Sequence, residues 1–292
     1  SATMFFQDCK LSHQAQITGI SHSVKEILPP DLLDLTQLQK EANIRYGYTA
    51  SEVYDIAQSL YEKKLISYPR TSSRYLTEDV FDSLSPIMAR VLSWELFPAA
   101  KGTGGIDISS LSRHVINAEK ANVHHAIIIT GIRPGNMSEK EMQVYRLIAG
   151  RMLEAFMAPC RIETTNVEAV CAAQHFKAEQ TRIIEAGWHD VFMHSDMVPK
   201  SGYSVNELPE VEKGDNLNVC GCNMVHKKQL PVNPFTDAEL VEYMELNGLG
   251  TVSSRTNIIR TLVNRKYIRY SGKYIVPTPK GMFTNETIRG KK

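Results

Sequence analysis

The hydrophobic and polar positions along the chain separate a helical region from β-rich segments on either side of it. Residues 1–27 alternate loosely between apolar and polar side chains, which predicts one or two strands ended by a Pro-Pro pair. Apolar residues then recur at helical spacing in residues 36–44 and 138–156. Residues 161–232 are rich in β-branched side chains between turn signals. A helical domain is therefore predicted to be inserted in a β domain.

Helix starts in this pattern are marked by a Thr or Ser followed three residues later by Glu. This capping-box spacing occurs at Thr49, Ser138 and Thr236, and it predicts that a helix begins after each of them. Residues 78–97 are also predicted to be helical, and residues 101–106 form a glycine-rich loop.

The C-terminal part has the order of a winged helix-turn-helix. One helix is predicted to end near residue 246 and a second to cover residues 253–265, with a glycine turn between the two. Residues 267–276 are predicted to form a hairpin. The formal net charge is only +1, yet residues 251–292 carry ten Lys or Arg and one acid. That segment predicts a basic surface for nucleic acid, with a solvated, solubilising face as the alternative.

Composition limits the remaining classes. A chain of 292 residues with 42% hydrophobic and 22% charged residues suggests two or three soluble domains. No apolar run is long enough to span a bilayer, no export signal precedes the first strand, and a reducing, cytoplasmic location is expected. The five cysteines form no even framework, and His124 and His125 are not at ligand spacing, so no structural metal is predicted.

The segment Tyr68-Pro69-Arg70, at the end of a helical pattern, carries the first candidate chemistry. A phenol with a reference pKa of about 10 is a poor nucleophile unless a neighbour stabilises charge at the atom it attacks. An arginine fork that holds two phosphate oxygens meets this need, and Pro69 restricts the backbone between the two side chains. Alternatively, Tyr68 is a half-buried core aromatic and Arg70 a solvated turn residue.

Three segments resemble the type IA DNA topoisomerases, specifically the topoisomerase III branch. They are SYPRTSSRYL at residues 67–76, NVHHAIIIT at 122–130 and GLGTVSSR at 248–255, and residues 38–48 and 233–240 match that branch as well. The resemblance implies an α+β multidomain fragment of a ring-shaped enzyme. It divides the chain into a β-arch domain (1–30 and 159–232), a helical, winged-helix-like tyrosine domain (31–158) and part of a basal, winged-helix-like DNA-binding domain (233–292).

In such an enzyme Tyr68 matches the nucleophile that forms a 5′-phosphotyrosine link with single-stranded DNA. Arg70 matches the arginine that holds the scissile phosphate, and His124 a histidine that contacts the phosphate near the break. Arg74 of the same motif is expected to contact DNA. Alternatively, His124 and His125 are core histidines that do not contact a phosphate.

The third motif lines the strand-binding groove in the family. By resemblance Thr251, Ser253, Ser254 and Arg255 contact DNA there, where a helix start offers free amides and hydroxyls. Ser253 and Ser254 are alternatively simple helix caps.

The sequence departs from the family pattern at three motif positions and in its extent. Ser72 stands where an aspartate is usual, and Ile129 and Val252 replace prolines. The TOPRIM-type domain, which carries the Mg²⁺ site, has no counterpart before Tyr68, and the C-terminal zinc modules are absent. The chain is therefore expected to be a fragment, with Ser1-Ala2 as a cloning remnant.

The implied activity is ATP-independent cleavage, strand passage and religation that relaxes or decatenates DNA. Expected partners are single-stranded and underwound duplex DNA and, in the family, a helicase; no membrane is involved, and a monomer suffices. A non-catalytic winged-helix nucleic-acid-binding protein with a structural tyrosine is the alternative from another class. A tyrosine recombinase or nicking enzyme fits less well, because the arginine order and metal motif of those enzymes are missing.

Overall fold

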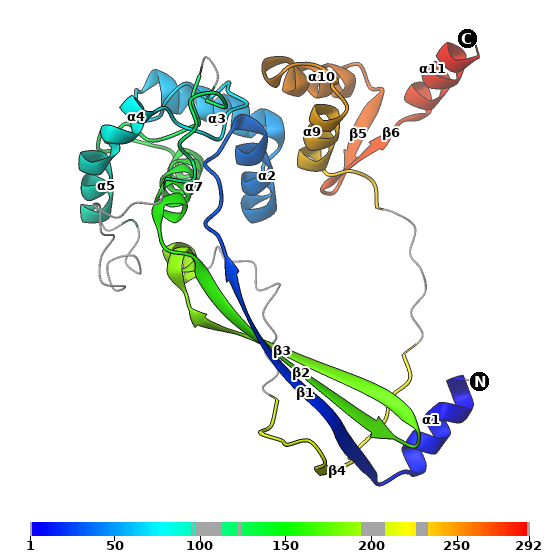
Figure 1. Ribbon diagram of the computed structural model, residues 1–292. Helices are drawn as coiled ribbons and strands as arrows, with labels where there is room; N and C mark the ends of the chain where they lie inside the picture. Colours follow the sequence, from blue (N-terminus) through cyan, green and yellow to red (C-terminus); the bar gives the residue numbers. More distant parts are fainter. Residues whose placement is uncertain are drawn as a thin grey trace. The chain divides into compact units, whose positions relative to one another are not determined.

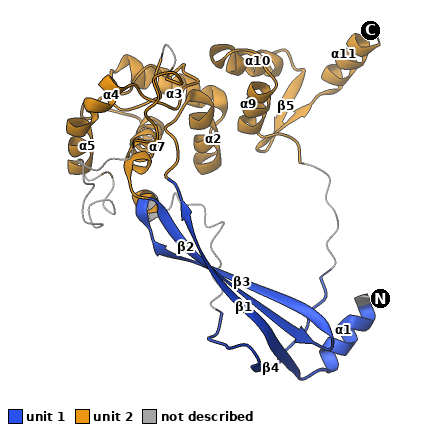
Figure 2. Ribbon diagram, in the orientation of Figure 1, with its two compact units in different colours: residues 1–28, 159–187, 199–231 blue, residues 29–158, 188–198, 232–292 orange. Residues whose placement is uncertain are grey.

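The computed structural model describes residues 2–94, 96, 113–121, 124–193, 208–225 and 233–290, and the chain divides into two compact units (Figure 1, Figure 2). Unit 1 contains residues 1–28, 159–187 and 199–231, and unit 2 contains residues 29–158, 188–198 and 232–292. Both units thus combine segments that are distant in sequence. The mixed α+β class predicted from the sequence is confirmed.

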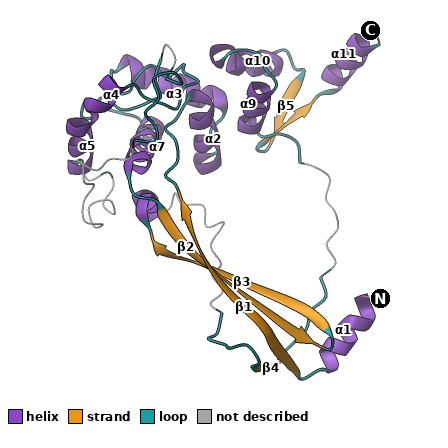
Figure 3. Cartoon of the chain, viewed as in Figure 1, coloured by secondary structure: helices purple, strands orange, loops and turns teal. Residues whose placement is uncertain are grey.

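Unit 1 is built around a four-stranded antiparallel sheet with the strand order β3-β2-β1-β4 (Figure 3). Its strands are β1 (Gln14–Ile27), β2 (Cys160–Cys171), β3 (Gln174–Glu185) and β4 (Asn216–Asn218). Ile20 lies opposite Val167 in the register of β1 and β2, and the register shifts between Ile17 and Gly19. The β-rich character predicted for this part is confirmed.

The start of unit 1 differs from the prediction. Residues Ala2–Leu11 form helix α1, so a strand over these residues was wrong, and only the β1 part of the N-terminal prediction is confirmed. Phe5 and Cys9 are four residues apart, a spacing that places both side chains on one helical face, and Cys9 is buried. A short alternation of apolar and polar residues did not distinguish the two periods.

Helices form most of unit 2 up to residue 193. They are α2 (Leu35–Tyr46), α3 (Ala50–Glu62), α4 (Glu78–Asp82), α5 (Leu84–Ser93), α7 (Glu139–Phe156) and α8 (Asp190–Met193). The predicted capping boxes at Thr49 and Ser138 are confirmed. The helix predicted over 78–97 is confirmed in part: it forms as two helices, α4 and α5, and α5 ends at Ser93. The predicted glycine-rich loop lies outside the described residues.

A single large cluster of buried side chains holds these helices together. Leu38 of α2, Leu60 of α3 and Leu147 of α7 are fully buried in it, and so is Ile66 just after α3. Burial of such a side chain stabilises the fold by about 1.5–3 kcal/mol. The segment that carries the tyrosine motif is therefore anchored directly in the core.

The C-terminal part of unit 2 follows the predicted order. It contains α9 (Asp237–Leu246), α10 (Val252–Asn264), the hairpin β5 (Ile268–Ser271) and β6 (Tyr274–Pro277), and α11 (Pro279–Arg289). The helices, the capping box at Thr236 and the hairpin are confirmed. Helix α11 was not predicted, although Thr278 caps it and Pro279 opens it.

Helices α9 and α10 contact α2 and α3 through buried polar groups. The Gln39 amide nitrogen donates to the Ala50 carbonyl at 2.9 Å and to the Thr256 hydroxyl at 2.9 Å. The Asp237 carboxylate accepts hydrogen bonds from the Ala50 N–H and from the Tyr270 hydroxyl. Desolvation by burial raises the pKa of Asp237, and these two donors oppose that rise.

Among the described helices, none is long and apolar enough to cross a membrane.

Candidate functional site

Two segments that are distant in sequence pair to form the base of the candidate site. Ile66 and Ile129 form an antiparallel bridge, and the Ser67 N–H donates to the Ile128 carbonyl at 2.8 Å. The Ser67 hydroxyl also donates to the Ala126 carbonyl at 3.1 Å and accepts from the Ile128 N–H at 3.0 Å. The first and second sequence motifs therefore lie side by side.

Tyr68 leaves this base between two aromatic rings. Its own ring is half-buried, with the Tyr61 ring centroid 5.5 Å away in an edge-on arrangement and the His124 centroid 4.5 Å away. The Tyr68 hydroxyl makes no hydrogen bond to any described residue. The structure thus brings the rings of Tyr68 and His124 together, and His124 is exposed.

Arg70 turns from the same segment toward helix α3. One terminal nitrogen donates to the Gln58 side-chain oxygen at 3.1 Å, and the guanidinium carbon lies 5.2 Å from the centre of the Tyr54 ring. The Nε atom of Arg70 is buried and has no hydrogen-bond partner. A buried donor without an acceptor costs about 1–3 kcal/mol, so an acceptor supplied by a ligand would stabilise this arrangement.

Buried hydroxyl groups fix the backbone between Arg70 and residue 76. The Thr71 hydroxyl donates to the His124 carbonyl at 2.7 Å and accepts from the Ser73 N–H at 3.0 Å. The Leu35 N–H donates to the Thr71 carbonyl at 3.1 Å, which ties this loop to the start of α2. Ser72, at the position where the family usually has an aspartate, is exposed. The hydroxyls therefore set the relation between the loop and His124.

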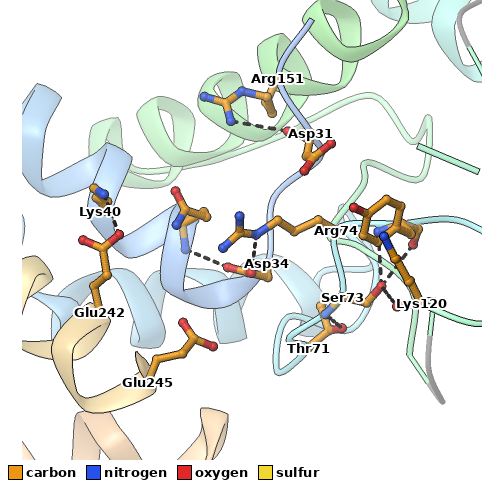
Figure 4. Close-up of polar contacts among 12 residues, drawn as sticks. Asp31, Asp34, Lys40, Thr71, Ser73, Arg74, Lys120, Arg151, Glu242 and Glu245 are labelled. Atoms are coloured by element: carbon orange, nitrogen blue, oxygen red, sulfur yellow. Dashed lines mark hydrogen bonds and ion pairs between the residues drawn. The ribbon is translucent and has the colours of Figure 1, made fainter. Parts of the chain in front are cut away.

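Arg74 is held by a carboxylate that sequence reasoning missed. Its Nε donates to a carboxylate oxygen of Asp34 at 2.7 Å, and the Asp34 side chain also accepts from the Gln37 N–H to cap α2 (Figure 4). Asp34 is buried, and desolvation raises its pKa against the opposing effect of its donors. Arg74 itself is predicted to contact DNA, and its side chain is 37% exposed.

The third motif forms the start of α10. The Ser254 hydroxyl accepts from the Thr251 N–H at 2.7 Å, so the capping alternative describes Ser254 correctly, and Ser253 is half-buried. Arg255 is only 8% exposed, and its Nη1 lies 3.3 Å from Glu245 Oε1. No hydrogen bond, ion pair or ring contact within the described ranges links these side chains directly to Tyr68, Arg70 or His124.

Three side chains that shape the site were not identified from the sequence. Tyr54, Gln58 and Tyr61 follow one another at four and three residues along α3, which is the spacing of one helical face. That polar and aromatic stripe was the available signal. His125 does not help to shape the site. Its Nδ1 lies 2.7 Å from the carbonyl oxygen of Ala126.

The described part of the chain offers no group of three or more His, Cys, Asp or Glu side chains arranged to hold a metal ion. The resemblance places the Mg²⁺ site in the TOPRIM-type domain and not among these residues.

Comparisons with known proteins agree with the motifs. A family model described as DNA topoisomerase matches residues 1–291. A DNA topoisomerase 3 of Bacillus licheniformis is 32% identical over 291 residues, which cover 91% of this chain and 40% of the relative. A DNA topoisomerase 1 of Methanocaldococcus jannaschii is 31% identical over 285 residues, which cover 97% of this chain and 36% of the relative.

Among solved structures, full-length topoisomerase I from Thermotoga maritima superposes with a TM-score of 0.77 at 22% identity, over 100% of this chain and 47% of that chain. At this identity the likeness shows the fold. The chain spans about two-fifths of the length of its curated relatives. Since the family model covers nearly every residue, the resemblance to the type IA enzymes is confirmed, and the chain belongs to the DNA topoisomerase family.

Proposed function

We propose that this chain is the strand-cleaving part of a type IA DNA topoisomerase, with Tyr68 as nucleophile and Arg70 as the clamp for the scissile phosphate. The observation that carries the proposal is the buried, unpartnered Nε of Arg70 two residues from a phenol whose oxygen makes no hydrogen bond to a described residue. A phosphodiester supplies the acceptor that this donor lacks.

The proposed reaction is a transesterification. The Tyr68 oxygen bonds to phosphorus, the bond from phosphorus to the 3′ oxygen breaks, and the 3′ oxygen gains a proton while the phenol loses one. The phosphodiester energy is kept in the 5′-phosphotyrosine bond, so religation needs no ATP. Arg70 stabilises charge on the phosphate oxygens as the bond forms.

His124 has two parts in this proposal. Its ring lies against the Tyr68 ring, which limits the orientations of the phenol. Its ring nitrogens make no hydrogen bond within the described residues, so one of them is free to donate to a phosphate oxygen.

The finer architecture follows the family. The β-arch domain comprises residues 1–30 and 159–232, the tyrosine domain 31–158 and the basal DNA-binding part 233–292. The Pro29-Pro30 and Ala158-Pro159 junctions are hinges through which the tyrosine domain lifts to pass a strand. Single-stranded and underwound duplex DNA are the substrates, relaxation or decatenation is the outcome, a monomer suffices, and Mg²⁺ acts from the TOPRIM-type domain.

A second candidate rests on the confirmed order of two helices and a hairpin from α9 to β6. That order favours a non-catalytic nucleic-acid-binding protein. It does not account for the arrangement around Arg70, and the two candidates differ in whether a covalent adduct forms.

The test is a denaturing gel for a covalent adduct between 3′-end-labelled single-stranded DNA and the full-length gene product in Mg²⁺. An adduct is expected with the wild type and with Tyr61→Phe, which loses the same hydroxyl from the neighbouring ring, and not with Tyr68→Phe. Adduct formation by Tyr68→Phe, or none by a wild type that binds DNA, would reject the nucleophile. Assayed alone, the 292 residues are expected to bind DNA and to cut it poorly.

Arg70→Ala separates clamping from general affinity. We expect it to reduce adduct formation at least about 100-fold, as loss of a charge-stabilising donor does, while DNA binding changes only a few-fold. Equal losses of cleavage and binding would contradict the clamp.

A further inference from the structure

One carboxylate of α9, Glu245, acts on arginines of both the first and the third motif. Glu245 pairs with Arg255 at 3.3 Å, and Figure 4 shows its side chain directed toward Asp34 and Arg74. Desolvation works to lower the pKa of Arg74, yet that pKa is raised by the hydrogen bond and charge of Asp34 and by the charge of Glu245. Glu245 is therefore within electrostatic reach of both arginines.

The donors of these two arginines are only partly used. Arg255 is only 8% exposed, its Nε is buried without a hydrogen bond, and its Nη1 makes only the ion pair with Glu245. Arg74 donates through Nε alone, and its terminal nitrogens belong to a side chain that is 37% exposed. A guanidinium has five N–H donors, so the carboxylates present leave several of them for another acceptor.

We propose that, in the absence of DNA, Glu245 occupies the place of a phosphate of the single strand. When the strand binds, its phosphate displaces Glu245 and is bound by Arg74 and Arg255 together. Asp34 is the positioning residue that holds Arg74 in the orientation this phosphate requires. This inference rests on the proposed function. A carboxylate and a phosphate offer similar pairs of oxygens to a guanidinium, so one substitutes for the other.

The proposal explains why the third motif makes no direct contact with Tyr68, Arg70 and His124. Arg74 follows Tyr68 by six residues on the same fixed loop, whereas Arg255 belongs to α10. A phosphate between the two arginines would connect the motifs through the strand itself. Binding of the strand then joins the tyrosine loop to α10 without any protein–protein contact between them.

A neighbouring acid provides a matched control. Glu242 is one turn before Glu245 on α9 and pairs with Lys40 of α2 at 2.7 Å (Figure 4). Its replacement by Gln changes the net charge as Glu245→Gln does, yet it frees no arginine. Any difference in DNA affinity between the two variants therefore depends on the position of the lost charge and not on the change in net charge.

The experiment measures binding of the 292-residue chain to a short fluorescein-labelled single-stranded oligodeoxynucleotide by fluorescence anisotropy, at fixed salt. Glu245→Gln is expected to lower Kd about fivefold, the effect of one uncompensated charge near a phosphate, and Glu242→Gln less than about twofold. In an Arg74→Ala background the gain from Glu245→Gln should fall below about twofold.

Asp34→Asn tests the positioning role, because Asn caps helices as well as Asp and α2 is retained. The gain from Glu245→Gln is expected to disappear in this background as well. A merely structural Asp34 would lower the melting temperature and leave that gain intact, which would overturn its role.

Equal gains from Glu245→Gln and Glu242→Gln, or weaker binding by Glu245→Gln, would overturn the inference and leave the proposed function standing. A wild-type chain that binds no single-stranded DNA would overturn both.

Discussion

Loss of the Thr71 hydroxyl should disturb stability and chemistry together. Thr71→Val keeps the shape of the side chain and removes the one group that donates to the His124 carbonyl at 2.7 Å and accepts from the Ser73 N–H at 3.0 Å. Thr71 and Ser73 are 3% and 2% exposed, so water does not replace the hydroxyl freely.

The expected loss follows from these two hydrogen bonds. The bond to the His124 carbonyl is worth about 1 kcal/mol, because His124 is exposed and its carbonyl keeps some access to water. The buried Ser73 N–H loses its acceptor entirely, at a cost of about 1–3 kcal/mol. We therefore expect Thr71→Val to lower the free energy of unfolding of unit 2 by about 3 kcal/mol.

Urea unfolding followed by tryptophan fluorescence measures this change, because both tryptophans, Trp94 and Trp188, belong to unit 2. The control is Ser72→Ala, which removes an exposed hydroxyl next to Thr71 and should change stability by less than about 0.5 kcal/mol. In the full-length protein Thr71→Val should also reduce adduct formation. A loss no larger than that of Ser72→Ala would refute the reasoning.

Two further predictions concern stability. Ala172 and Ala173 join β2 to β3 with φ of 50° and 61°, a two-residue turn suited to Asn-Gly, so Asn and Gly at these positions should stabilise unit 1 by about 1–2 kcal/mol, measured by hydrogen exchange of the β2 and β3 amides. The Lys63 ammonium, with other donors, lowers the pKa of Glu141 to about 2. Glu141→Gln should therefore destabilise unit 2 at pH 7 by about 1 kcal/mol, allowing for screening at Lys63. In urea unfolding at several pH values this difference should be constant above pH 4.5, shrink below it, and disappear as the pH falls through the folded-state pKa of about 2. A pH-independent difference would contradict the ion pair.

Local signals predicted the helices of unit 2 well. The Thr49, Ser138 and Thr236 capping boxes depend on residues three apart, and all three form. Helix α1 and helix α11 were missed for different reasons. The first lies in a segment whose alternation fits two periods, whereas Thr278 and Pro279 gave a start signal for the second that was not used.

The site was predictable only in part. Motif resemblance identified Tyr68 and His124, which the structure places in ring contact although they are distant in sequence. The contact of Asp34 with Arg74 spans 40 positions, and the influence of Glu245 comes from another helix, so no local pattern announces either one. Such contacts arise from tertiary packing, which propensity and spacing do not describe.

The backbone and the charged side chains of the site differ in how many of their hydrogen-bonding groups have partners among the described residues. Thr71 and Ser73 engage the loop backbone through buried hydroxyls, and Ile66 anchors it in the core, so the loop is held before any ligand arrives. Arg70 and Arg255, in contrast, retain buried N–H groups without hydrogen bonds. Under the proposed function, the substrate phosphate supplies acceptors for these donors. The fixed loop backbone orients the donors in advance, so that binding adds hydrogen bonds without reordering the loop.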